Sequence, residues 1–178
     1  DKAVVVGVEL QEAMVERAAR GIALNGLADR VHMMAGDVRE MDKTLKSGSF
    51  DVAVCNPPYR PLLSGRGNPE REQLQARHEV EGGLVDFLRS GAALLRHRGR
   101  MCLVYPSERV VELFSAMRQH NLEPRRVRFV QSFADVPAYL VLVEGTKGAG
   151  ASLTALPPLF IYRCENEYTE EMAGWLKG

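Results

Sequence analysis

Short apolar runs along the chain alternate with longer segments whose apolar residues recur at helical spacing. Residues 3–8 form the first run, and residues 11–25 then place apolar side chains three and four positions apart before an Asn-Gly pair, a typical helix stop. Two further runs, at residues 30–34 and 50–55, predict additional strands. Strands that alternate with a helix in this way are typical of a parallel sheet, so the pattern predicts an α/β fold.

The second half of the chain continues the alternation and ends in a different kind of pairing. Residues 82–95 carry one apolar face and predict a helix, residues 101–105 predict a strand, and Ser107 is placed to cap the next helix. Residues 127–133 and 138–143 predict two more strands that are joined by only four residues. Because a connection that short cannot cross over a sheet, these two strands are expected to be antiparallel.

The strand at residues 50–55 stops at Asn56-Pro57-Pro58-Tyr59. Neither proline has an N–H to donate to a sheet, and the first favours an extended Asn56, so the segment predicts a stiff turn at the carboxyl end of a strand. Ligands of open α/β sheets bind outside this edge. The Asn56 side-chain oxygen and the Pro57 carbonyl can accept both hydrogens of a planar NH2 group, and Tyr59 can stack on that group. The turn therefore predicts alkylation of an adenine or glutamine-amide nitrogen, promoted by orientation and desolvation.

Acidic residues follow the two strands that precede this turn. Glu9 follows the first strand and Asp37 the second. An acid at such a strand end commonly accepts the ribose hydroxyls of a nucleotide cofactor, which suits Glu9, and Asp37 suits a hydrogen bond to the adenine amino group. Acids in this position also cap helices or face solvent, but their order ahead of the proline turn favours binding. The predicted cofactor-binding residues are Glu9, Leu10, Asp37, Val38 and Asn56.

The 178 residues are 46% hydrophobic, enough for one domain with its own core. Twenty-three basic residues balance 23 acidic ones, so net charge neither requires nor excludes a nucleic-acid partner. The three cysteines, Cys55, Cys102 and Cys164, lack metal-ligand spacing and are interpreted as small buried residues of a reduced cytoplasmic protein. No apolar run has the length of a membrane span.

Arginines gather in two places, and each group is either a phosphate contact or a solvated surface. The segment His97-Arg98-Gly99-Arg100 is expected to form a turn. Near the end of the chain, Thr169 is placed to cap a short terminal helix. The two arginine groups are Arg96, Arg98 and Arg100, and Arg125, Arg126 and Arg128.

The proline turn resembles motif IV of the S-adenosylmethionine-dependent amino methyltransferases, which has the form Asn/Asp-Pro-Pro-Tyr/Phe/Trp. Over nearly its whole length the chain is similar to the tRNA adenine-N6 methyltransferase family that modifies an adenine beside the anticodon of a valine tRNA. The resemblance implies a Rossmann-like sheet of seven strands, S-adenosylmethionine as cofactor, and tRNA as partner. It makes Asn56, Pro57, Pro58 and Tyr59 the catalytic residues. The other matching segments are Val8-Glu9-Leu10, Gly36-Asp37-Val38, Ala76-Arg77-His78-Glu79, Pro106-Ser107-Glu108-Arg109, Leu156-Pro157-Pro158-Leu159 and Glu167-Tyr168-Thr169-Glu170-Glu171.

One part of the family pattern is missing. Such enzymes begin with a strand and an Asp-x-Gly-x-Gly-x-Gly loop that holds the methionine part of the cofactor, and no such loop occurs in this sequence. In the family that strand lies between the strands ending here at Glu9 and Asn56. Residues 1–178 are therefore expected to be the carboxyl-terminal part of a single methyltransferase catalytic domain, which alone binds the cofactor poorly.

Three functions remain open on the sequence alone. The first is methylation of tRNA adenine N6, and the second is N5 methylation of a glutamine in a protein partner, since the turn does not distinguish a base from an amide. The third is a non-catalytic RNA-binding domain on a methyltransferase fold. The polar segment at residues 61–77 is either a loop that closes over the substrate or a surface insertion.

Overall fold

The computed structural model describes residues 3–59 and 83–177, and its largest element is a mixed sheet with the strand order β3-β4-β6-β5-β7. Strands β3 and β4 are parallel, whereas β6 runs antiparallel to both β4 and β5, which confirms the antiparallel pair expected from the short connection. Strands β7 and β8 add parallel pairings along β5. These strands are β3 (Phe50–Cys55), β4 (Leu95–Pro106), β5 (Leu122–Gln131), β6 (Leu140–Lys147), β7 (Thr154–Ala155) and β8 (Leu159–Phe160).

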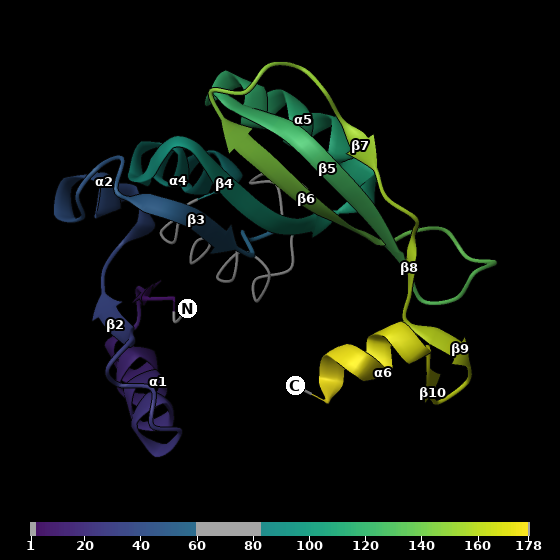
Figure 1. Cartoon of the computed structure of the whole chain (residues 1–178), viewed down its shortest axis with the longest axis horizontal. Helices are drawn as coiled ribbons and strands as arrows, with labels where there is room; N and C mark the ends of the chain where they lie inside the picture. Colours follow the sequence, from purple (N-terminus) through teal and green to yellow (C-terminus); the bar gives the residue numbers. More distant parts are fainter. Residues whose placement is uncertain (1–2, 60–82, 178) are drawn as a thin grey trace, which may run out of the picture.

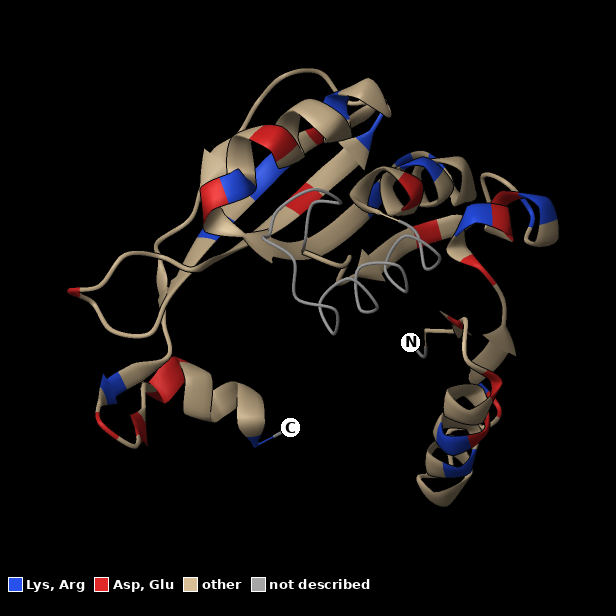
Figure 2. Ribbon diagram, turned by 180° about the vertical axis from the view of Figure 1, so that it is seen from behind, with Lys and Arg blue, Asp and Glu red and all other residues tan. Residues whose placement is uncertain are grey.

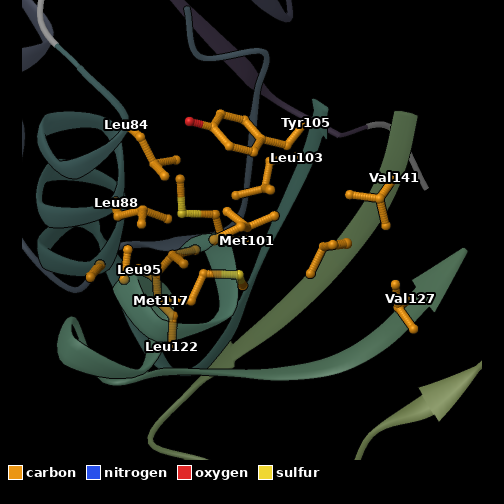
Figure 3. Close-up of a cluster of buried hydrophobic side chains, with 14 residues drawn as sticks. Leu84, Leu88, Leu95, Met101, Leu103, Tyr105, Met117, Leu122, Val127 and Val141 are labelled. Carbon is orange, nitrogen blue, oxygen red and sulfur yellow. The ribbon is translucent and has the colours of Figure 1, made fainter. Parts of the chain in front are cut away.

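Helices α4 (Leu84–Leu94) and α5 (Val110–Gln119) pack on one face of this sheet (Figure 1). The core lies between them and the sheet, and Figure 3 shows side chains from α4, β4 and α5 meeting there. Several of these side chains are completely inaccessible to solvent, so each contributes its full apolar burial. Leu88, Leu95, Tyr105, Leu113, Met117, Leu122 and Val141 are all 0% exposed.

A smaller unit contains β1 (Val5–Glu9), α1 (Glu12–Leu24) and β2 (Val31–Ala35), in which the two strands pair in parallel. The helix ends as expected at its Asn-Gly pair, where Gly26 has a φ of 64°. Figures 1 and 2 both show this unit standing apart from the large sheet. It is attached through the 3-10 turn η1 (Val38–Glu40) and helix α2 (Met41–Thr44).

Arg89 of α4 holds this attachment. Its guanidinium donates to the Arg39 carbonyl at 2.8 Å and pairs with the Asp42 carboxylate at 3.1 Å. Met41, which is 4% exposed, adds an apolar contact in the same segment. The smaller unit is thus anchored by a few side chains and not by a continuous sheet.

Strands β1 and β3 each pair on one side only within the described part of the chain. Their apolar side chains are unusually accessible for parallel strands, which are normally covered on both faces. Val54 of β3 is 79% exposed, and Val5, Val8 and Val52 are also exposed. The two open edges belong to the strands between which the sequence analysis placed the missing family strand.

The chain ends in a hairpin of β9 (Tyr162–Cys164) and β10 (Glu167–Tyr168) followed by α6 (Glu170–Leu176). The predicted cap is confirmed, because the Thr169 hydroxyl accepts from the Met172 N–H at 3.3 Å. Arg128 of β5 fixes this terminal unit by pairing with both Glu171 carboxylate oxygens, at 2.6 and 2.7 Å. It also donates to the Pro157 carbonyl at 2.9 Å and lies over the Trp175 ring.

Replacing Arg128 should release the terminal unit without unfolding the sheet. In Arg128→Ala we expect chymotrypsin to cleave near Tyr168 and Trp175 faster than in the unmodified chain, because a bidentate ion pair and a cation–π contact are lost together. Mass spectrometry of the fragments checks this. Arg125→Ala is the matched control, since Arg125 on the same strand makes one bond to the Gly150 carbonyl. Equal cleavage rates of the two variants would show that Arg128 does not fix the terminal unit.

Three expectations are corrected. Residues 97–100 belong to β4, because the strand absorbs Arg98, at a φ of 64°, where its register with β3 shifts. Ser107 does not cap α5; its hydroxyl donates to the Ala138 carbonyl, and a 3-10 turn, η2 (Ser107–Arg109), precedes the helix. Cys164 is exposed at the hairpin, whereas Cys55 and Cys102 are half-buried. The predicted loop at residues 61–77 lies outside the described residues.

Candidate active site

The turn Asn56-Pro57-Pro58-Tyr59 leaves the carboxyl end of β3, where Cys55 pairs with Leu103 of β4. The Pro57 side chain is less than 2% exposed, so the turn is anchored in the packed interior. Asn56 just before it is exposed, and Pro58 and Tyr59 are half-buried. A buried proline thus presents an accessible amide at the edge of the sheet where α/β proteins bind ligands.

Tyr59 is held by an aromatic neighbour. Its ring meets that of Tyr105 edge to face, with centroids 5.9 Å apart and planes at 85°. Tyr105 is fully buried in the core, and this burial raises the pKa of its hydroxyl. The contact orients Tyr59, while its stacking on a planar ligand remains a prediction.

Arg109 of η2 contacts the end of the same turn. Its Nη1 donates to the Tyr59 carbonyl, while its Nε and Nη2 bind the two Glu112 carboxylate oxygens. The guanidinium also lies 5.0 Å from the centre of the Tyr105 ring. The hydrogen bonds between Arg109 and Glu112 raise the pKa of the guanidinium and lower the pKa of the carboxyl group. Sequence reasoning missed this contact; its only signal was Arg109's place in a segment shared with the resembled family.

The predicted acids lie together at the end of the smaller sheet. The Gly36 N–H donates to the Glu9 carbonyl at 2.9 Å, so the two strand ends are joined. One Glu9 carboxylate oxygen accepts from the Gln11 N–H at 3.0 Å, and the other has no partner among the described residues. Leu10 beside it is 40% exposed. Glu9 therefore keeps an acceptor for a ligand.

Asp37 is already engaged. Both of its oxygens accept from the Arg39 side chain, and one also accepts from the Arg39 N–H at 2.9 Å, which caps η1. This pairing, led by the side-chain hydrogen bond, lowers the pKa of Asp37. Val38 next to it is half-buried. Asp37 thus shows the capping role that acids often take after strands, and it binds a ligand only if Arg39 shifts.

Asn56 is not joined to these acids. No hydrogen bond in the described ranges, 3–59 and 83–177, links it to Glu9 or Asp37, and β3 and β1 belong to different sheets. Figure 1 shows the β1–β2 pair separated from β3. The structure therefore assembles the two halves of the predicted site separately.

The arginine groups are largely paired with acids on the sheet surface. Arg96 pairs with Asp51, and both Arg100 and Arg126 pair with Glu144. Figure 2 accordingly shows basic and acidic residues interleaved over the main sheet and its helices. Exposed ion pairs contribute little to stability, so this pairing does not prevent the arginines from binding phosphate. Phosphate contacts by the two arginine groups therefore stay a prediction. Within residues 3–59 and 83–177, none of the helices combines the length and the hydropathy of a membrane span.

Cys55, directly before the turn, should be chemically inert. Burial raises the pKa of its thiol to about 12, so the reactive thiolate is scarce at pH 8. We expect iodoacetamide at pH 8 to modify the exposed Cys164 first and Cys55 at least about 10-fold more slowly. Peptide mass spectrometry over time measures both rates, and equal rates would contradict the burial of Cys55.

Comparison with known proteins adds independent information. A family described as a methyltransferase domain matches residues 1–135, well over half of the chain. The chain belongs to this methyltransferase domain family. The family resemblance and the α/β fold class seen in the sequence are both confirmed.

Individual proteins that are similar to the chain also carry methyltransferase names. A tRNA1(Val) (adenine(37)-N6)-methyltransferase from Pectobacterium carotovorum is 31% identical over 136 residues, 76% of this chain and 54% of that protein. A predicted O-methyltransferase from Agrobacterium tumefaciens has a TM-score of 0.74 at 21% identity, covering 97% of this chain and 76% of that one. Geranyl diphosphate methyltransferase in complex with SAM has a TM-score of 0.53 at 16% identity, covering 82% and 69%. The structures show the fold, and the chain spans about half the length of the curated relatives it matches.

Proposed function

We propose that this chain belongs to a cytoplasmic enzyme that transfers a methyl group from S-adenosylmethionine to the exocyclic N6 of an adenine in tRNA. The observation that carries the proposal is the turn after β3, in which a buried Pro57 holds an exposed Asn56 at the carboxyl edge of the sheet. The methyltransferase family match supports the reaction type. The curated relatives are named as tRNA1(Val) (adenine(37)-N6)-methyltransferases, which supports adenine in tRNA as the acceptor.

The turn acts by holding the amino group. The Asn56 side-chain oxygen and the Pro57 carbonyl each accept one of its hydrogens, which directs the nitrogen lone pair away from the turn. Tyr59 stacks on the base. No strong general base is needed, because the nitrogen becomes acidic once it is alkylated and loses its proton to water. S-adenosylmethionine, when bound, supplies the electrophilic methyl group.

The residues of the smaller sheet fit part of this cofactor. One Glu9 carboxylate oxygen has no hydrogen-bond partner within residues 3–59 and 83–177, which suits a ribose hydroxyl, and the exposed Leu10 offers an apolar surface beside it. Asp37 and Val38 suit the adenine edge, provided that Arg39 releases one Asp37 oxygen. Among the described residues, Glu9 can therefore accept from the ribose without rearrangement. Asp37 must first give up a hydrogen bond from Arg39 before it accepts from the adenine.

We also propose that residues 1–178 are the carboxyl-terminal part of one catalytic domain, whose remaining segment supplies a strand between β1 and β3. In the described part of the chain these two strands each pair on one side only, and Val54 of β3 is 79% exposed, which supports this arrangement. Such a strand joins the two sheets and brings Asn56 alongside Glu9. The chain together with that segment is called the full-length protein below.

The test uses the full-length protein with tritiated S-adenosylmethionine and tRNA, with and without ribonuclease. The proposal predicts label in acid-precipitable RNA that disappears after ribonuclease treatment. Label that survives ribonuclease and migrates with protein would instead establish glutamine methylation. No cofactor binding in calorimetry would indicate a non-catalytic domain.

A further inference from the structure

Arg109 connects the distant proline turn to two residues near it in sequence, one at the end of β4 and one at the start of α5. It donates to the Tyr59 carbonyl, 50 positions away, at the end of the proline turn. It forms a two-point ion pair with Glu112 on α5 and lies over the ring of Tyr105 at the end of β4. The Arg109 side chain is only 17% exposed, so the guanidinium that makes these contacts is largely shielded from solvent.

The geometry shows why this link matters to the turn. At its start, the turn is fixed by the pairing of Cys55 with Leu103, and in its middle by the buried Pro57. Neither proline can add a backbone donor. Among the described residues, the other end of the turn is fixed at the Tyr59 carbonyl, which accepts from Arg109.

Glu112 makes this donor rigid. A guanidinium held by both oxygens of a carboxylate has its remaining N–H directions set by its planar fork. The Tyr105 ring limits movement of the cation on one face, and the same ring contacts Tyr59. The buried Tyr105 thus contacts both Arg109 and Tyr59, the residue that Arg109 holds in place.

We infer that Arg109 is a positioning residue for methyl transfer: with Glu112 and Tyr105, it fixes the Tyr59 end of the turn so that Asn56 and Tyr59 hold the target base in one orientation. Arg109 acts through Tyr59 and touches no reacting atom. The inference rests on the proposed function and goes beyond it by assigning the turn's geometry to a residue outside the turn.

The first test measures the turn directly, by amide hydrogen exchange in the full-length protein. Asn56 and Tyr59 are the only residues of the turn with backbone N–H groups, so their two amides report its mobility. In Arg109→Ala we expect both to exchange at least about 10-fold faster. Arg118→Ala, which removes the ion pair between Arg118 on α5 and Glu123 on β5, should leave them unchanged.

The second test separates positioning from folding. Arg109→Ala should lower kcat about 100-fold with KM changed less than about threefold, since misplacement of catalytic groups acts on the transition state. Arg109→Lys retains a donor but loses the two-point pair, so an intermediate kcat is expected. A purely structural role would lower the unfolding midpoint and leave kcat of the folded fraction unchanged, as would hold for Arg118→Ala.

Unchanged exchange at Asn56 and Tyr59 in both Arg109→Ala and Arg109→Lys would overturn the inference, as would an unchanged kcat in the folded variants. If Arg109→Ala does not fold, Arg109→Lys and Glu112→Gln carry the same comparison. If the unmodified protein transfers no methyl group to RNA, the proposed function fails, and the exchange measurement alone decides whether Arg109 positions the turn.

Discussion

Asn56→Ala is expected to reduce kcat of the full-length protein by about 10²–10³-fold or more, while the affinity for S-adenosylmethionine stays within a few-fold. The change removes one of the two acceptors that hold the amino group, and the remaining Pro57 carbonyl cannot fix the nitrogen alone. Because Asn56 is exposed and Pro57 carries the packing, the fold should be unaffected. Single-turnover rates and calorimetry measure the two quantities.

Asn56→Asp is the matched comparison for this prediction. It keeps an acceptor oxygen of the same reach, so part of the rate should be retained. Unfolding midpoints of both variants should equal that of the unmodified protein. A near-normal rate in folded Asn56→Ala would show that the amide does not hold the acceptor nitrogen.

The second large effect concerns the open strand edges. The 178-residue chain is expected to bind S-adenosylmethionine at least about 100-fold more weakly than the full-length protein. In the structure Glu9 ends β1 and Asn56 follows β3, and these strands belong to separate sheets, so binding must first bring the two residues together. Calorimetry on both proteins under the same conditions gives the ratio. Equal affinities would show that the described residues form the whole cofactor site.

A pair of substitutions checks the proposed strand without the cofactor. Val54→Asp should destabilise the full-length protein by at least about 3 kcal/mol, since an inner strand of a parallel sheet is covered on both faces and the substitution would bury an unpaired charge there. In the 178-residue chain, where Val54 is 79% exposed, the cost should stay within about 0.5 kcal/mol. Val111→Asp is the control, because Val111 is equally exposed but lies on helix α5 and not on a sheet edge. Urea unfolding of the four variant proteins provides the comparison.

Local signals predicted those parts of the fold that local interactions determine. The Asn-Gly pair ended α1, Thr169 capped α6, and β5 and β6 are antiparallel as the short link predicted, although that link spans residues 132–139 and not the four residues expected. The charged stretch before Met101 was misread as a turn, because its polar residues hid a strand that continues through a bulge.

The site was only partly predictable, since some of its contacts depend on distant residues. The exposed amide and buried proline of the turn follow from strand and proline chemistry. The engagement of Asp37 by Arg39 is a local alternative that the spacing of an acid and an arginine two positions apart already allowed. The contact between Arg109 and Tyr59 spans 50 positions, so no local pattern indicates it.

The most direct test of the central claim is the identity of the methylated group. The full-length protein is incubated with labelled S-adenosylmethionine and tRNA, the RNA is digested to nucleosides, and the products are separated by chromatography. The account predicts label in N6-methyladenosine with the unmodified protein and almost none with Asn56→Ala. Label in another nucleoside, or an N6-methyladenosine yield that Asn56→Ala does not reduce, would contradict it.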